Sequence, residues 1–150
     1  MIEVDPGSSG PAAYNAIGRL ELKKRELEAA REAFQAALEI DRMNAGAYDG
    51  LANVLLEEGQ HDEAIGHLLT ALRFRPAQPQ TITTLAQVLR DREDYPMAHK
   101  YLGLIHAQLE QPVASVRHLE RSLELDAEQP EAEQMRYLLE EMKKRASERV

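Results

Sequence analysis

Apolar side chains recur along much of this chain at steps of three and four residues, which is the spacing of an amphipathic helix. Two consecutive segments carry Tyr48, Leu51, Ala52 and Leu55, then Ala64, Leu68, Ala71 and Leu72. The break Glu58-Gly59-Gln60 lies between them, and glycine is the residue that a helix C-terminus prefers. The pattern therefore predicts a helix, a tight turn and a second helix.

The same hairpin pattern recurs every 34 residues. Tyr14, Ile17 and Gly18 align with Tyr48, Leu51 and Ala52, and Ala30, Phe34 and Ala37 align with Ala64, Leu68 and Ala71. A further 34 positions lead to Ile82, Leu85, Ala86 and Leu89, followed by Ala98 and Leu102. A period in this range is typical of stacked repeat proteins.

Small residues occupy fixed places in each repeat. Gly18, Ala52 and Ala86 fall on the first helix of each pair, and Ala30, Ala64 and Ala98 fall on the second. Two helices approach closely only where one of them offers a small side chain, and bulky neighbours then fill the space beside the crossing. The sequence therefore predicts successive hairpins that nest against one another.

The order of these residues resembles the tetratricopeptide repeat, whose pattern is W-x2-L-G-x2-Y, then A-x3-F, then P. The unit 45–78 matches throughout and closes at Pro76, whereas the unit 11–44 departs at Glu21 and at Arg42. The resemblance covers about residues 11–129. It implies an all-α, right-handed superhelical stack of antiparallel helix pairs, with about eight helices including a C-terminal capping helix.

The chain divides accordingly into consecutive segments. We expect a flexible N-terminal segment at 1–10, repeats at 11–44, 45–78 and 79–112, a fourth-unit helix at 113–129 and a capping helix at 130–150. The second half of the third repeat is degenerate. Leu102-Gly103 resembles the Leu-Gly pair of the repeat, so the segment 95–109 also matches the pattern of a first helix. Chain continuity favours the first register and predicts helices near 79–92, 95–109, 112–126 and 130–147.

Composition and charge restrict the function. The net charge is −8 and no basic stripe is present, so we expect no nucleic-acid partner. No apolar run approaches the roughly 18 residues of a membrane span, and the N-terminus lacks the pattern of an export signal. We therefore expect no membrane partner and a cytoplasmic location. The chain has no cysteine, hence no disulfide or thiolate chemistry of its own.

Residues suited to catalysis or cofactor binding are scarce. His99 and His106 share a helical face with Glu110 one turn beyond, but histidines packed between helices explain this spacing better than a metal site does. No glycine-rich phosphate loop and no nucleophile-elbow motif is present. We expect no enzyme activity, no catalytic residue, no metal and no cofactor.

The resemblance implies that the first helix of each pair lines a concave groove that binds another protein or peptide. The groove positions not used in packing include Asn15, Arg19, Asp49, Asn53, Thr83, Gln87 and Arg90. Amide and hydroxyl groups both donate and accept, so they suit the backbone of a partner's extended segment or helix. The arginines would place an acidic group of the partner. A merely solvated polar face is the alternative.

One partner class is not expected. Repeats that capture the acidic C-terminus of a chaperone use a dense set of lysine, arginine and asparagine, and the segment Gln80 to Gln87 lacks the cations. Two other hypotheses stay open: a regulatory or substrate-recruiting arm of a larger enzyme, and a self-assembly module that forms homo-oligomers through exposed repeat ends.

Overall fold

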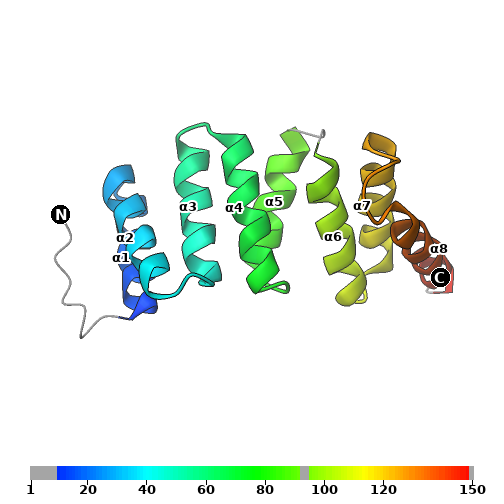
Figure 1. Ribbon diagram of the computed structural model, residues 1–150, viewed down its shortest axis with the longest axis horizontal. Coiled ribbons are helices and arrows are strands. Elements are labelled where there is room, and N and C mark those ends of the chain that lie inside the picture. The colour runs from blue at the N-terminus through cyan, green and yellow to red at the C-terminus, as the bar shows by residue number, and fades with distance from the viewer. Residues whose placement is uncertain (1–9, 92–94, 149–150) are drawn as a thin grey trace. The chain divides into compact units, whose positions relative to one another are not determined.

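The computed structural model describes residues 10–91 and 95–148, and within these residues every regular element is an α-helix (Figure 1). In chain order the helices are α1 (Pro11–Lys23), α2 (Leu27–Ile40), α3 (Ala45–Glu57), α4 (His61–Phe74), α5 (Pro79–Asp91), α6 (Pro96–Gln108), α7 (Pro112–Leu125) and α8 (Ala132–Glu148). These eight helices of the described residues confirm the predicted all-helical fold. The predicted flexible segment 1–10 lies outside the described residues except for Gly10.

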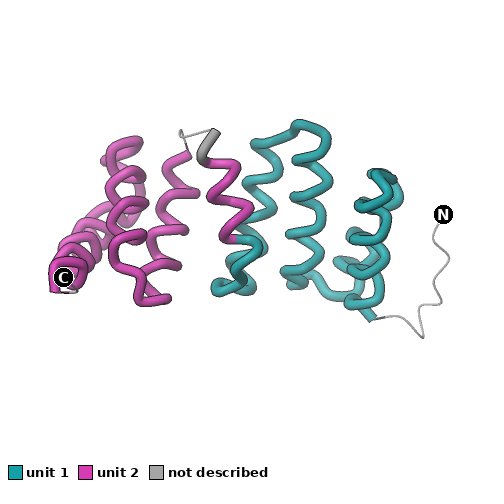
Figure 2. The backbone as a smooth tube through the Cα atoms, turned by 180° about the vertical axis from the view of Figure 1, so that it is seen from behind, with its two compact units in different colours: residues 1–81 teal, residues 82–150 magenta. Residues whose placement is uncertain are grey.

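The chain forms two compact units, residues 1–81 and 82–150, and the boundary falls inside α5 (Figure 2). In the first unit, α1 packs on α2, α2 on α3 and α3 on α4, and α1 also contacts α3. In the second unit, α6 packs on α7 and α7 on α8. No helix within the described residues has the length and hydrophobicity that a membrane span requires.

Three of the hairpins turn through the same backbone conformation. Arg25, Gly59 and Glu110 each adopt a positive φ, of 63°, 78° and 55° respectively. In each turn the residue that follows donates its N–H to a carbonyl five positions back, which is the bond that closes a Schellman-type helix end. Glycine takes this conformation without strain, whereas Arg25 and Glu110 adopt it at a cost of about 1 kcal/mol. The turn between α6 and α7 thus repeats those between α1 and α2 and between α3 and α4.

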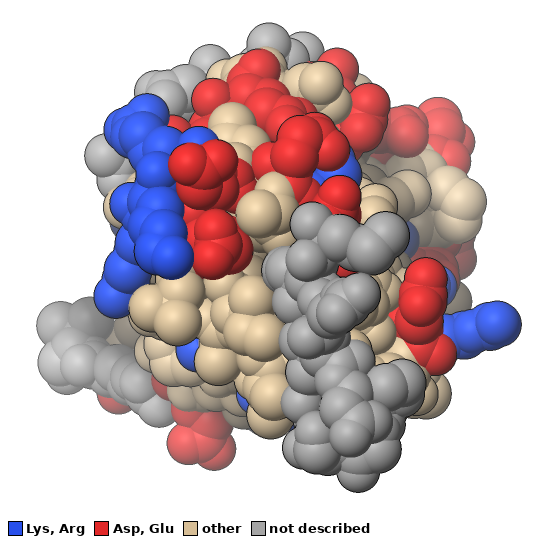
Figure 3. Space-filling model, turned by 90° about the vertical axis from the view of Figure 1, so that its left-hand side faces the viewer, with Lys and Arg blue, Asp and Glu red and all other residues tan. Residues whose placement is uncertain are grey.

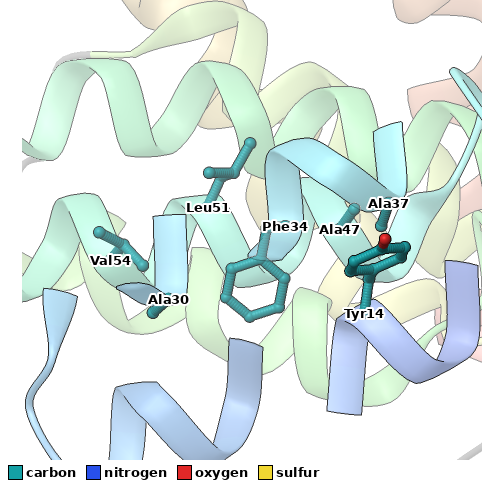
Figure 4. Close-up of a cluster of buried hydrophobic side chains, with 7 residues drawn as sticks. All are labelled: Tyr14, Ala30, Phe34, Ala37, Ala47, Leu51 and Val54. Atoms are coloured by element: carbon teal, nitrogen blue, oxygen red, sulfur yellow. The ribbon is translucent and has the colours of Figure 1, made fainter. Parts of the chain in front are cut away.

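The core of the first unit centres on Phe34, which is fully buried (Figure 4). It belongs to a cluster with Tyr14, Ala30, Ala37, Ala47, Leu51 and Val54. Its ring lies against Gly18 of α1 and Gly50 of α3. A Cβ atom added to Gly18 would come within 2.6 Å of the ring, and one added to Gly50 would come within 2.2 Å. The small residues of the repeat therefore permit close helix packing, as the sequence predicted.

The core of the second unit reproduces this contact between α6 and α7. A Cβ atom on Gly103 would lie 2.7 Å from the side chain of Leu119, and the two residues are 16 positions apart, as are Gly18 and Phe34. The hydroxyl of Ser115, also buried, donates to the carbonyl of Gly103 at 2.8 Å. Helix α8 covers α7 through a cluster that contains Leu119, Met135 and Leu139.

Candidate partner-binding surface

Three of the predicted groove residues lie close together where α1 and α3 pack side by side. Arg19 is exposed on α1, and Asp49 and Asn53 are half-buried one turn apart on α3. The Nδ2 atom of Asn53 donates to the backbone carbonyl of Asp49 at 2.9 Å and lies 3.4 Å from its Oδ2. We call this surface, defined by Arg19, Asp49 and Asn53, the α1–α3 face.

The carboxylate of Asp49 is held in place from the first turn of α5. Its Oδ1 atom accepts a hydrogen bond of 2.8 Å from the hydroxyl of Thr81, which is fully buried. The pKa of Asp49 lies above its ordinary value because burial disfavours the charged form, although the hydroxyl of Thr81 and the charge of Arg19 act in the opposite direction. The α1–α3 face therefore presents an acidic group of fixed orientation beside a cation.

Asn15, another of the predicted groove residues, is buried where α1 meets the start of α3. It is only 5% exposed, and its Nδ2 atom donates to Oδ1 of Asn44 at 2.8 Å. The same Oδ1 atom accepts from the backbone N–H of Ala47 at 2.9 Å, which caps the N-terminus of α3. Asn15 thus joins α1 to the start of α3, and its amide nitrogen is used inside the chain.

The remaining predicted residues belong to the second unit. Thr83 and Gln87 are exposed one turn apart on α5. Arg90 lies in the same helix, but its side chain is outside the described residues. The structure therefore brings Arg19, Asp49 and Asn53 together, and it shows Thr83 and Gln87 on one helix of the other unit.

Two residues of this region were not anticipated. Asn44 directly precedes α3, and asparagine is a preferred N-cap residue, so its place could have been read from the sequence. Thr81 lies 34 positions after Ala47, which is also fully buried. Because Thr81 takes the place of a buried residue of the preceding repeat, the sequence could have predicted that its hydroxyl is buried and makes a hydrogen bond.

Three of the five histidines, His99, His106 and His118, pack at the contact between α6 and α7. The Nδ1 atoms of His99 and His118 are 3.1 Å apart, and the rings of His118 and His106 stack at a centroid distance of 5.5 Å. Burial, together with the charges of His99, His106 and Arg117, lowers the pKa of His118 to about 4. Among the described residues, no three His, Cys, Asp or Glu side chains are grouped to hold a metal ion.

A family model described as tetratricopeptide repeat matches residues 10–79. No curated protein sequence matches the chain.

Several solved structures are similar to this chain, and one of them shares its fold. Pseudomonas aeruginosa pilF is 23% identical with a TM-score of 0.54, and the alignment covers 90% of this chain and 72% of pilF. The APC/C hetero-tetramer Cut9-Hcn1 is 19% identical with a TM-score of 0.46, over 81% of this chain and 26% of that one. The present chain therefore spans about a quarter of that relative's length. The first TPR of Spaghetti (RPAP3), bound to the HSP90 peptide SRMEEVD, is 16% identical with a TM-score of 0.43, over 98% and 99% of the two chains.

Proposed function

We propose that the α1–α3 face binds a peptide segment or helix of a partner protein, because residues 10–79 match the tetratricopeptide repeat family, whose stacked helices are protein-interaction scaffolds. The observation that carries the proposal is the group formed by Arg19, Asp49 and Asn53. It combines a cation, a carboxylate and an amide on one accessible surface. In this proposal the chain itself performs no catalysis.

The polar groups of the α1–α3 face match what a peptide offers. The guanidinium of Arg19 supplies several N–H donors for carbonyl or carboxylate oxygens. The Nδ2 atom of Asn53 is bonded to its own helix, so its Oδ1 atom is the part that accepts an N–H from the partner. A peptide backbone carries both kinds of group and pairs with both residues.

The orientation of Asp49 adds selectivity. The hydrogen bond from Thr81 restrains the carboxylate before any partner arrives, so binding costs less side-chain entropy. A partly buried acid accepts most strongly from a charged donor, because charge-assisted hydrogen bonds are about twice as strong as neutral ones. We therefore expect the preferred segment to carry a lysine or arginine that reaches Asp49, and an acidic residue or free carbonyl beside it for Arg19.

The predicted residues of α5 are included in the proposal as a separate contribution. Thr83, Gln87 and Arg90 belong to the second unit, and Gln87 offers both a donor and an acceptor from an exposed position. We expect Gln87→Ala to weaken the binding of a segment that contacts α5, and to leave the binding of a segment held by the α1–α3 face alone unchanged.

The test is selection of peptides from a displayed random library on the full chain, followed by fluorescence-anisotropy titration of the selected sequences. Arg19→Ala and Asn53→Ala are each expected to weaken binding by about tenfold, which is the loss of one good hydrogen bond or ion pair. The matched controls are Arg73→Ala and Gln35→Ala, which remove the same kinds of group from exposed positions on α4 and α2. Equal losses in the variants and the controls, or peptides that bind Arg19→Ala and Asn53→Ala at full strength, would rule out this surface.

A further inference from the structure

The second unit contains a cavity of about 560 Å³ where α5, α6 and α7 meet. Residues of all three helices line it, among them Ala86 and Leu89 of α5, His99 of α6, and Arg117, His118 and Arg121 of α7. Its volume falls within the roughly 300–1,000 Å³ of typical ligand pockets. None of these residues belongs to the α1–α3 face, whose residues are all in the first unit.

Ala86 differs from its counterparts one and two repeat lengths earlier in the chain. These counterparts are Ala52 and Gly18, each on the first helix of a hairpin, and both are buried. Phe34 of α2 covers Gly18 so closely that an added Cβ atom would lie 2.6 Å from its ring, and Ala52 has no exposed surface. Ala86 is only half-buried, and it lines the cavity. The cavity therefore leaves room for a large apolar side chain over a small residue, which is the place that Phe34 fills in the first hairpin.

Leu89 and His118 add uncharged surface to the cavity. Leu89 is buried one turn after Ala86 on α5. Burial lowers the pKa of His118 to about 4, so its ring is neutral at pH 7. The Nδ1 atoms of His118 and His99 lie 3.1 Å apart and share a hydrogen bond, which holds both rings in place. An apolar or aromatic group suits this part of the cavity, because an ion would lose its hydration there.

Arg117 gives the cavity an exposed cation. The two acidic residues of the wall already have partners, because Glu124 pairs with Arg121 and Glu120 pairs with Lys143 of α8, each at 3.4 Å. Within the part of the chain that the structure describes, Arg117 forms no ion pair. On the side of the first unit that Figure 3 views, by contrast, basic side chains lie directly beside acidic ones. Arg117 can therefore bind an acidic group that this chain does not itself provide.

We propose that this cavity binds a segment of a partner protein that places a large apolar side chain over Ala86 and an acidic side chain on Arg117. The apolar part follows from the first hairpin, where a phenylalanine side chain of a helix covers the corresponding small residue. Because that side chain belongs to a polypeptide, a protein segment is the class of ligand that matches the place. The acidic part follows from charge complementarity, since a guanidinium donates two parallel N–H bonds to a carboxylate. The site is separate from the α1–α3 face and does not rest on peptide binding there.

The first test asks whether the chain itself fills the space over Ala86. Ala86→Leu extends a side chain into the cavity, so the midpoint of urea unfolding of the full chain should stay unchanged or rise. Ala52→Leu is the matched variant, and its midpoint should fall, because Ala52 has no exposed surface and a leucine there overpacks the helix crossing. An equal fall in the two variants would show that the space over Ala86 is already filled, and it would overturn the proposal.

The second test is selection of peptides from a displayed random library on the full chain, followed by fluorescence-anisotropy titration. We expect a class of peptides with a large apolar and an acidic residue, whose binding weakens at least about tenfold in Ala86→Leu and in Arg117→Glu. These peptides should bind Arg19→Ala like the wild type, which separates them from ligands of the α1–α3 face. The matched controls are Ala13→Leu and Arg145→Glu, which make the same replacements at exposed positions of α1 and α8 and should leave binding unchanged.

A charge exchange tests the contact with Arg117. A selected peptide whose acidic residue is replaced by lysine should lose binding to the wild type and regain it with Arg117→Glu, because opposite charges then meet again. Equal binding of the lysine peptide to both proteins contradicts the contact.

Three further results would each overturn the proposal. The first is that no selected peptide responds to both Ala86→Leu and Arg117→Glu. The second is binding of 3-phenylpropionate in the cavity without binding of any peptide there, which would assign the site to a small aromatic acid. The third is a wild-type dimer that Ala86→Leu converts to a monomer in sedimentation velocity, which would assign it to a second copy of the chain. Peptides that respond to Arg19→Ala are scored separately, so failure of either proposal leaves the other open to test.

Discussion

The replacement of Gly50 by alanine measures how tightly the first unit is packed. The ring of Phe34 lies between Gly18 on α1 and Gly50 on α3 and has no exposed surface. A Cβ atom added at Gly50 would lie 2.2 Å from Cε1 and 2.3 Å from Cζ of the ring. Carbon atoms that are not bonded prefer separations of about 3.5–4.0 Å. The ring would therefore have to move, and its close contact with Gly18 leaves it no room to move on the other side.

The size of the effect follows from two opposing contributions. Overpacking a core typically lowers stability by about 1–3 kcal/mol. Because the ring of Phe34 is confined on both sides, we expect a steric cost at the upper end, of about 3 kcal/mol. Alanine is better than glycine inside a helix by about 1 kcal/mol. We therefore expect Gly50→Ala to lower the free energy of unfolding by about 2 kcal/mol.

Gly66→Ala is the matched control. Gly66 lies inside α4, is exposed, and has no atom within 4 Å of an added Cβ. This substitution should stabilise the chain by about 1 kcal/mol, because only the helix preference changes. The difference between the two variants isolates the steric contribution of Phe34, at about 3 kcal/mol.

Urea unfolding followed by far-ultraviolet circular dichroism is the suitable assay, because the chain contains no tryptophan. The reasoning is refuted if Gly50→Ala raises the unfolding free energy as much as Gly66→Ala does. A further check is Phe34→Leu, which makes room for the added methyl group. Combined with Gly50→Ala, it should lose clearly less stability than the two single losses together.

Two further predictions concern other contacts. The pKa of His118 is lowered to about 4 in the folded chain, against 6.5 for an ordinary histidine, so the unfolded chain binds a proton first as pH falls. Stability should therefore drop between pH 6.5 and 4, and because solvent screens this partly exposed ring we expect about 1–2 kcal/mol from it. Urea titrations at pH 7 and pH 4.5 should show a smaller drop for His118→Gln, and an unchanged drop would contradict the assignment. Asn44→Ala removes the acceptor for both Ala47 and the buried Asn15, so we expect a loss of about 2 kcal/mol in thermal or urea unfolding. Asn44→Asp keeps the acceptor and should lose much less, whereas equal losses would show that the cap is not the cause.

Much of the fold could be predicted because it depends on residues close together in the chain. The helices after residue 79 begin and end within about two residues of the predicted places, since prolines and the apolar spacing mark them locally. The close approach at Gly18 was predicted from the 34-residue repeat. For 95–109 the sequence allowed two registers. The contact of Gly103 with Leu119 and the turn at Glu110 repeat the contact and the turn of the α1–α2 hairpin, and the assignment of the repeats between 79 and 129 stays a prediction.

The sequence predicted the candidate surface less completely than it predicted the fold. Helical spacing placed Arg19, Asp49 and Asn53 on exposed or half-buried sides of their helices, and the structure brings them together. The same spacing also selected Asn15, which is buried and bonded to Asn44. The role of these residues in binding stays a prediction.

By itself, the sequence determined that this protein is built from helical hairpins, because periodicity and small residues decide which side of each helix is apolar. Only the tertiary structure decided what each polar side chain in or near the core touches. Thr81 bonds to Asp49 from 32 positions away, and Asn15 bonds to Asn44 from 29 positions away. Such partners are set by how neighbouring helices are rotated and shifted against each other, and a hydrogen bond requires that geometry to within a few tenths of an ångström.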